Sequence, residues 1–249
     1  MKQAGTLALC VAIAAISPSS LAADTPPAGI RAEIQIGLCS PTELIVKALH
    51  LRPRGAATKV WLFDDAALTL FARGLRLRLR VADGRSELTL KVADQDCARL
   101  DPAVVASGEG KCEHDVHGAR MEAAVSLVRR LDGRSTDDLL AGRLSPAQAL
   151  SPAQVRYLRD VVGYWPLASD LRALGPTELE TYRAAGKPYD VDISELPAGA
   201  RYAEISRKVP VADIAHARAS LEADLTRAGV EMCADQSAQA VNKLRALLR

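Results

Sequence analysis

Three arginines alternate with leucines in the stretch LFARGLRLRLRVADGRSELTLKV, residues 70–92. Arg76, Arg78 and Arg80 are spaced two apart, and an Asp-Gly pair leads into a second alternating run that ends at Lys91. Residues two apart on a strand share a face, and Asp-Gly favours a tight hairpin turn, so the sequence predicts a hairpin with one cationic face. If this cationic face is exposed to solvent, it needs no special explanation. Turned inward in a closed barrel, it would need bound anions.

Other segments with a two-residue period mix acids and bases on one face. They are Arg31, Glu33 and Gln35; Lys111, Glu113 and Asp115; and Glu204, Ser206 and Lys208. Mixed charge on several strands is unusual for a protein core. It suits a site where fork-shaped arginines and lysines bind phosphate oxygens while carboxylates hold a divalent metal.

The elements that must position these residues are short strands with helices between and after them. Strands are expected at residues 30–38, 58–64, 109–118, 175–184, 188–196 and 200–209, in addition to the hairpin. Helical patterns are expected at residues 40–51, 65–74, 119–131, 144–162, 211–229 and 235–249. In the first of these helices Ser40 and Glu43 fit a capping box, and 144–162 holds two Ser-Pro-Ala-Gln helix starts. This order predicts an α+β domain or a β-barrel with helices packed outside.

The N-terminus has the features of a secretory signal peptide. Residues 1–23 contain a short basic start, an apolar run and a small-residue cleavage pattern ending in Ala22-Ala23. The apolar run is too short to span a bilayer, so we expect a periplasmic or secreted protein with no membrane association after cleavage. Residues 30–249 are expected to form a single domain with a helical insertion at about 119–172.

The net charge and the cysteine content restrict the possible partners and the possible disulfides. The formal net charge of the 249-residue chain is +2, which argues against a nucleic-acid partner held by bulk charge. Four cysteines remain after the leader, and in an oxidising compartment they permit three disulfide pairings. One of these joins Cys97 to Cys112 and Cys39 to Cys233, which would staple a loop and tie the two ends of the domain together.

The hairpin region resembles the CYTH family, the triphosphate tunnel metalloenzymes. The family stretch Tyr-Phe-Asp-Thr, Gly-Leu-x-Leu-Arg-x-Arg and Leu-Thr-Leu-Lys is similar to residues 62–65, 74–80 and 88–91. The family's Arg-x-Glu-x-Glu strand is approximated by residues 111–115, and its late Glu-x-Glu by residues 204–206. The resemblance is specific over residues 61–92 and looser over 31–115 and 200–249.

This resemblance implies a fold and a set of roles. The fold would be a closed antiparallel β-barrel, or tunnel, of about eight strands with helices packed outside. The residues expected to bind phosphates are Arg78, Arg80, Lys91, Lys111 and Lys208; the expected metal ligands are Glu33, Glu113, Asp115 and Glu204; and the expected catalytic pair is Glu113 and Lys91.

The chain also departs from the family pattern. The family begins with Glu-x-Glu-x-Lys, whereas this chain has Glu33, Gln35 and Gly37 at those positions, and Ser206 replaces another acid. The anion-binding residues of the family pattern are therefore better retained than the catalytic ones. We expect a tunnel that binds a phosphorylated small molecule or polyphosphate without turnover, and then without a cofactor.

Two other functions stay open. The first is a phosphohydrolase that uses Mg²⁺ or Mn²⁺ and acts on inorganic triphosphate or an organic triphosphate such as a nucleotide. The second is a structural or interaction protein in which the charges pair among themselves.

Overall fold

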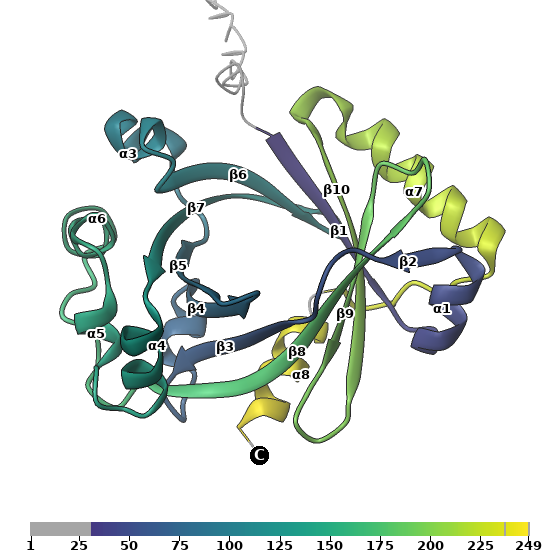
Figure 1. Ribbon diagram of the computed structural model, residues 1–249. Helices are drawn as coiled ribbons and strands as arrows, with labels where there is room; N and C mark the ends of the chain where they lie inside the picture. The colour runs from purple at the N-terminus through teal and green to yellow at the C-terminus, as the bar shows by residue number, and fades with distance from the viewer. Residues whose placement is uncertain (1–30, 237, 249) are drawn as a thin grey trace, which may run out of the picture.

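The strands of this chain form one sheet that closes on itself (Figure 1). The computed structural model describes residues 31–236 and 238–248, so the expected signal peptide lies outside the described residues. Within these residues there are ten strands: β1 (Arg31–Leu38), β2 (Leu51–Pro53), β3 (Thr58–Asp64), β4 (Leu75–Ala82), β5 (Arg85–Val92), β6 (Gly110–His117), β7 (Arg120–Leu131), β8 (Arg172–Ala184), β9 (Asp190–Glu195) and β10 (Arg201–Pro210).

Hydrogen bonding closes the sheet into a barrel. The order is β8-β3-β4-β5-β7-β6-β1-β10-β9, and β9 pairs back onto β8, while β2 extends β8 outside this ring. The predicted closed barrel with outer helices is confirmed, with nine strands in the described ring rather than about eight. The barrel is also mixed rather than purely antiparallel, because β1 pairs in parallel with β6.

Eight α-helices lie in the described part of the chain. They are α1 (Thr42–Ala48), α2 (Thr69–Ala72), α3 (Pro102–Ala106), α4 (Gly133–Leu140), α5 (Pro146–Ala149), α6 (Pro152–Arg156), α7 (Ile214–Ala228) and α8 (Ala238–Leu247). None of the helices described here combines the length and the apolar character needed to cross a bilayer.

The predicted cationic hairpin is β4 and β5. Asp83 and Gly84 form its turn with φ angles of +49° and +71°, the left-handed values that a two-residue hairpin turn requires. Leu75, Leu77 and Leu79 are buried in an apolar cluster on the outer side of the barrel wall. Burial of each leucine contributes roughly 1.5–3 kcal/mol, and because alternate residues face opposite sides, this burial turns the arginines inward.

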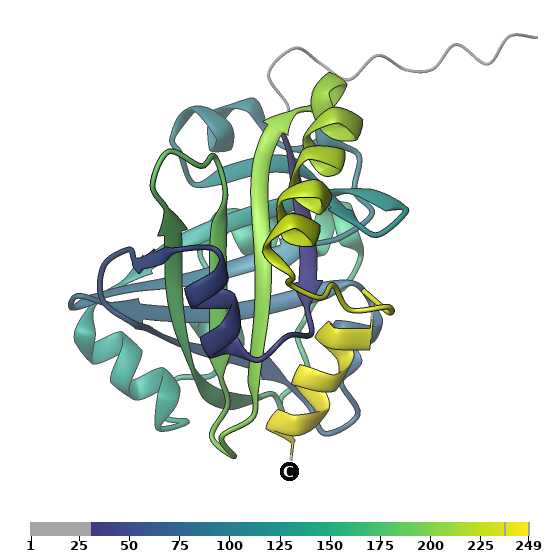
Figure 2. The ribbon, with the colours of Figure 1, turned by 90° about the vertical axis from the view of Figure 1, so that its right-hand side faces the viewer.

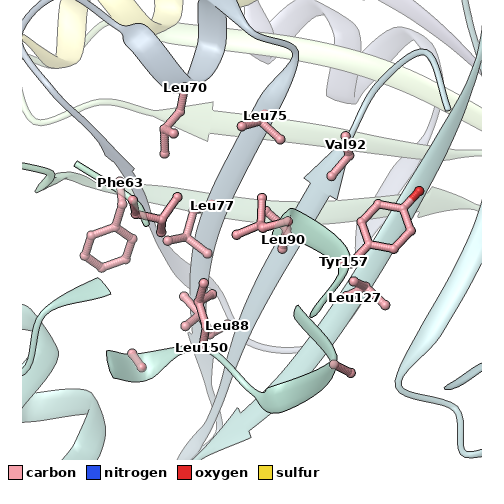
Figure 3. Packing of buried hydrophobic residues seen from close by; sticks show 14 of the residues in the cluster. Phe63, Leu70, Leu75, Leu77, Leu88, Leu90, Val92, Leu127, Leu150 and Tyr157 are labelled. Carbon is pink, nitrogen blue, oxygen red and sulfur yellow. The ribbon is translucent and has the colours of Figure 1, made fainter. Parts of the chain in front are cut away.

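That outer apolar cluster holds one half of the barrel against the helices α4, α5 and α6 (Figure 3). Leu88 and Leu90 of β5 and Leu127 of β7 meet Leu150 and Tyr157, which follow α5 and α6 (Figure 3). A second cluster lies on the other half of the barrel, where α1 and α7 cover β1 and β10 (Figure 2). The apolar core therefore lies outside the barrel wall, which leaves the interior to polar groups.

The segment 119–131 is a predicted helix that the structure shows to be a strand. Its sequence ARMEAAVSLVRRL predicts a helix, but it forms the long strand β7, which pairs with β5 on one side and β6 on the other. Alanine, methionine, glutamate and arginine favour helices, and this local preference loses to two ladders of strand pairing. The helices of the expected insertion at 119–172 accordingly begin only at Gly133, and they pack outside the barrel.

Two helix starts in the insertion have the expected caps. Ser145 and Ser151 each cap a helix, and Gln148 and Gln154 complete the two capping boxes. The capping box predicted at Ser40 is wrong. Ser40 lies one residue too early, and its hydroxyl accepts a hydrogen bond from the backbone N–H of Glu231 instead.

The structure contains two disulfides. Of the three possible pairing schemes, they follow the one that ties the two ends of the domain together. Cys39 bonds to Cys233 across a separation of 194 residues, and Cys97 bonds to Cys112 across 15 residues. The first joins the end of β1 to the segment between α7 and α8, and the second joins the loop after β5 to β6. Both links constrain the unfolded chain and so favour the folded barrel.

Candidate functional site

The inward face of the hairpin carries its charged residues. Directly opposed residues of an antiparallel pair lie on the same face, and Arg76 is opposite Lys91, Arg78 opposite Thr89 and Arg80 opposite Glu87. Strand pairing therefore gathers four cations on one wall of the barrel. We call Arg76, Arg78, Arg80 and Lys91 the basic wall.

Two arginines of the basic wall lack partners for part of their guanidinium groups. The Nε atoms of both Arg78 and Arg80 are buried and have no hydrogen-bond partner among the described residues. Burial, followed by the charges of Arg80 and Arg76, lowers the pKa of Arg78 to about 9, against the opposing effect of Glu33 and Asp192. The guanidinium groups of the basic wall are therefore only partly satisfied by the fold itself.

Lys208 connects two acids on the opposite part of the interior. Its Nζ lies 2.8 Å from Glu113 Oε1 and 4.0 Å from Glu33 Oε2, and Lys111 also donates to Glu113. Burial acts to raise the pKa of Glu113, but the hydrogen bonds from Lys111 and Lys208 hold it below its ordinary value. We call Glu33, Lys111, Glu113 and Lys208 the lysine–glutamate cluster.

Asp115 is the most buried acid of the predicted set. Its side chain is 1% exposed and forms an ion pair with Lys91, whose side chain is 22% exposed. Strand pairing places Asp115 beside Glu33, which links the basic wall to the lysine–glutamate cluster. The Oδ1 atom of Asp115 is buried without a hydrogen-bond partner among the described residues.

Glu204 faces a second acid, Asp192, across the β9–β10 pair. Burial and the nearby Asp192 carboxylate raise the pKa of Glu204 to about 7. Lys243 of α8 reaches this region and donates a 2.6 Å hydrogen bond to Ser194 Oγ. Burial lowers the pKa of Lys243, while the charges of Glu204 and Asp192 act to raise it.

One opening of the interior is a cavity of about 290 Å³. It is lined by Glu33, Arg54, Thr58, Arg80, Leu179, Thr181, Asp190, Asp192 and Ser206. At its rim Asp190 forms ion pairs with Arg54 at 2.9 Å and Arg183 at 2.6 Å, and Thr181 donates a 2.6 Å hydrogen bond to Asp192. A further cavity of about 420 Å³ also includes Arg80 and Thr58 and extends along the β4–β5 turn.

The structure thus brings most of the predicted site residues to one barrel interior. Sequence reasoning missed Lys243, because an amphipathic C-terminal helix gives no sign that one lysine reaches a barrel interior. The alternation of β9 shows that Asp190 and Asp192 share a face, but it does not show which face is inside. Arg76 carried a signal, because it continues the arginine repeat, but it was not among the residues predicted to bind phosphate.

Three of the four acids predicted as metal ligands contact lysines, and the fourth, Glu204, faces Asp192. Among the described residues no three His, Cys, Asp or Glu side chains are placed to hold a metal ion. Glu33 and Glu113 contact Lys208, and Asp115 contacts Lys91. As arranged, this donor set does not fit the oxygen-rich coordination that Mg²⁺ or Mn²⁺ requires.

Comparisons with known proteins support the fold. No protein-family model and no curated protein matches the sequence. Among solved structures, a Hippeastrum protein described as a "putative adenylyl cyclase" with a dominant triphosphatase activity superposes with a TM-score of 0.53 at 17% identity, over 85% of this chain and 94% of that one. A "putative adenylate cyclase" of Bacillus halodurans gives a TM-score of 0.56 at 15% identity, over 83% and 93%.

These identities are too low to transfer an activity, but the agreement covers nearly the whole of each neighbour. The long-range pairings that close the barrel agree with the sequence resemblance carried by residues 61–92. The chain therefore has the closed-barrel fold of the CYTH-type proteins.

Proposed function

We propose that this protein binds a phosphorylated small molecule or a polyphosphate inside its barrel. The observation that carries this proposal is the pair of arginines on the basic wall. Arg78 and Arg80 each direct a guanidinium to the interior and leave a buried Nε without a partner among the described residues. A buried guanidinium nitrogen without a partner is costly, so its presence favours an anionic ligand that offsets the cost.

Phosphate is the anion whose geometry suits this wall. A guanidinium presents its N–H groups as a planar fork that matches two phosphate oxygens, and charge-assisted hydrogen bonds of this kind are among the strongest in proteins. Arg80 also lines the 290 Å³ cavity, which gives a ligand a route to the wall. Lys91, Lys111 and Lys208 would contribute further positive charge if the ligand draws them away from their acids.

The compartment is part of the proposal. Two disulfides favour an oxidising environment, and together with the N-terminal pattern they support export to the periplasm or beyond. Under this proposal the ligand is a phosphorylated molecule present outside the cytoplasm.

Hydrolysis is the second candidate function. The Hippeastrum neighbour, described as having a dominant triphosphatase activity, is the observation that favours it. In that case Glu113 and Lys91 would have the catalytic roles predicted from the sequence, with Mg²⁺ or Mn²⁺ as cofactor. Release of inorganic phosphate from tripolyphosphate in the presence of either metal tests this candidate directly.

Calorimetric titration with tripolyphosphate tests the binding proposal. We expect Arg78→Met and Arg80→Met each to weaken binding by about 10-fold or more, since hydrogen bonds to charged groups contribute roughly 1.5–3 kcal/mol. Arg52→Met is the matched control, because Arg52 is exposed on β2, outside the barrel ring. Absence of binding by the native protein, or native affinity in Arg78→Met and Arg80→Met, would refute the proposal.

A further inference from the structure

We infer that the lysines of the barrel interior take the charge-neutralising place of a divalent cation, so that the polyanion binds without metal. This inference rests on the proposed function and adds to it the source of positive charge. It starts from the difference between the expected metal ligands and their observed partners.

The lysine–glutamate cluster gives the first argument. Lys208 Nζ lies 2.8 Å from Glu113 and 4.0 Å from Glu33, and Lys111 contacts the second oxygen of Glu113. Both oxygens of Glu113 are thus engaged by ammonium groups. A metal ion could bind there only after displacing two cations that already neutralise the carboxylate.

Asp115 gives the second argument. Its 1% exposed carboxylate is paired with Lys91, and it lies beside Glu33 in the parallel β1–β6 pair. Coordination of a metal by Asp115 would leave the ammonium of Lys91 without its partner in a largely enclosed position. Separation of a buried ion pair is strongly unfavourable, so Lys91 opposes the binding of a metal ion to Asp115.

The balance of charge gives the third argument. Glu33, Glu113 and Asp115 contact Lys91, Lys111 or Lys208, whereas Arg78 and Arg80 form no ion pair in the described part of the chain and feel Glu33 and Asp192 only at longer range. An entering anion therefore meets positive charge that the chain itself supplies. Lys111 and Lys208 are paired with Glu113, but their side chains are 51% and 41% exposed and can turn from it toward the anion.

Titration of the native protein with tripolyphosphate in excess EDTA, and again in excess Mg²⁺ corrected for the Mg²⁺ bound by tripolyphosphate itself, tests the inference. We expect the two dissociation constants to agree within about threefold. Binding that appears only with Mg²⁺ would overturn this inference while leaving the proposed function intact. Binding in neither condition would overturn the proposed function, and this inference with it.

A variant allows metal binding to be measured in the absence of a polyanion. Lys208→Met removes the ammonium shared by Glu33 and Glu113, so we expect about 10-fold weaker tripolyphosphate binding in EDTA and a gain in Mn²⁺ binding followed by electron paramagnetic resonance. Lys47→Met, at an exposed position on α1, is the control for loss of a lysine. Tight Mn²⁺ binding by the native protein that Lys208→Met does not improve would overturn the inference.

Discussion

Lys208 of β10 and Glu113 of β6 form a 2.8 Å ion pair although 95 residues separate them in the chain. The two strands do not pair with each other. Both flank β1, antiparallel on one side and parallel on the other, so the ion pair passes over the β1 strand next to Glu33. Closure of the barrel creates this contact, and it holds two cations at one carboxylate when no ligand is bound.

Glu113→Gln should therefore strengthen anion binding. The substitution keeps the shape of the side chain but removes the charge that attracts Lys111 and Lys208, so both ammonium groups become available to a ligand. We expect tripolyphosphate to bind about 3- to 10-fold more tightly in EDTA, measured by calorimetry. Glu109→Gln, at an exposed position before β6, is the matched control. Weaker binding in Glu113→Gln would indicate that this carboxylate helps to bind the ligand.

Arg78→Met should stabilise the ligand-free protein and weaken its binding of tripolyphosphate. Arg78 lies between Arg76 and Arg80, and its buried Nε has no partner among the described residues, so an apolar side chain of similar length removes the cost of burying this charge. We expect a gain of about 1 kcal/mol in the free energy of unfolding, or roughly 2–4 °C in Tm for a chain of this size. A lower Tm than the native protein would mean that the guanidinium is already satisfied within the fold.

The two disulfides should differ in their effect on stability. In the chain-entropy account, a link that closes a longer loop removes more freedom from the unfolded state. Replacement of Cys39 and Cys233 by serine opens a separation of 194 residues, whereas replacement of Cys97 and Cys112 opens one of 15. We expect losses of roughly 3 kcal/mol for the shorter link and more for the longer, measured by urea denaturation. A larger loss for the shorter link would show that native packing around it dominates.

Much of the barrel could be predicted from the sequence because its strands alternate so regularly. The outward leucines and inward arginines of β4 follow from a two-residue period and a hairpin turn, both of which are local signals. β7 could not be recognised in this way. Its composition favours a helix, and only the neighbouring strands β5 and β6, far apart in the sequence, make it a strand.

The site was predictable in its residues but not in their partners. The alternating strands indicated which lysines and carboxylates share faces, and in the structure the strand pairings turn these faces toward one interior. The ion pairs of Lys208 with Glu113 and of Lys91 with Asp115 depend on which strands become neighbours when the barrel closes. Lys243 is the extreme case, since it comes from a helix outside the strand pattern.

Gln154 should be important for holding the outer helices on the barrel, and its counterpart Gln148 provides the control. Both glutamines complete a capping box, but only the fully buried Gln154 also donates to strand carbonyls, at 3.1 Å to Leu88 and 2.9 Å to Leu127. Gln154→Met loses the cap and leaves these carbonyls without that donor, whereas Gln148→Met loses the cap alone. At about 1 kcal/mol per hydrogen bond, we expect Gln154→Met to reduce the free energy of unfolding by about 2 kcal/mol more than Gln148→Met, measured by urea denaturation. Equal losses would mean that apolar packing alone holds α6 against β5 and β7.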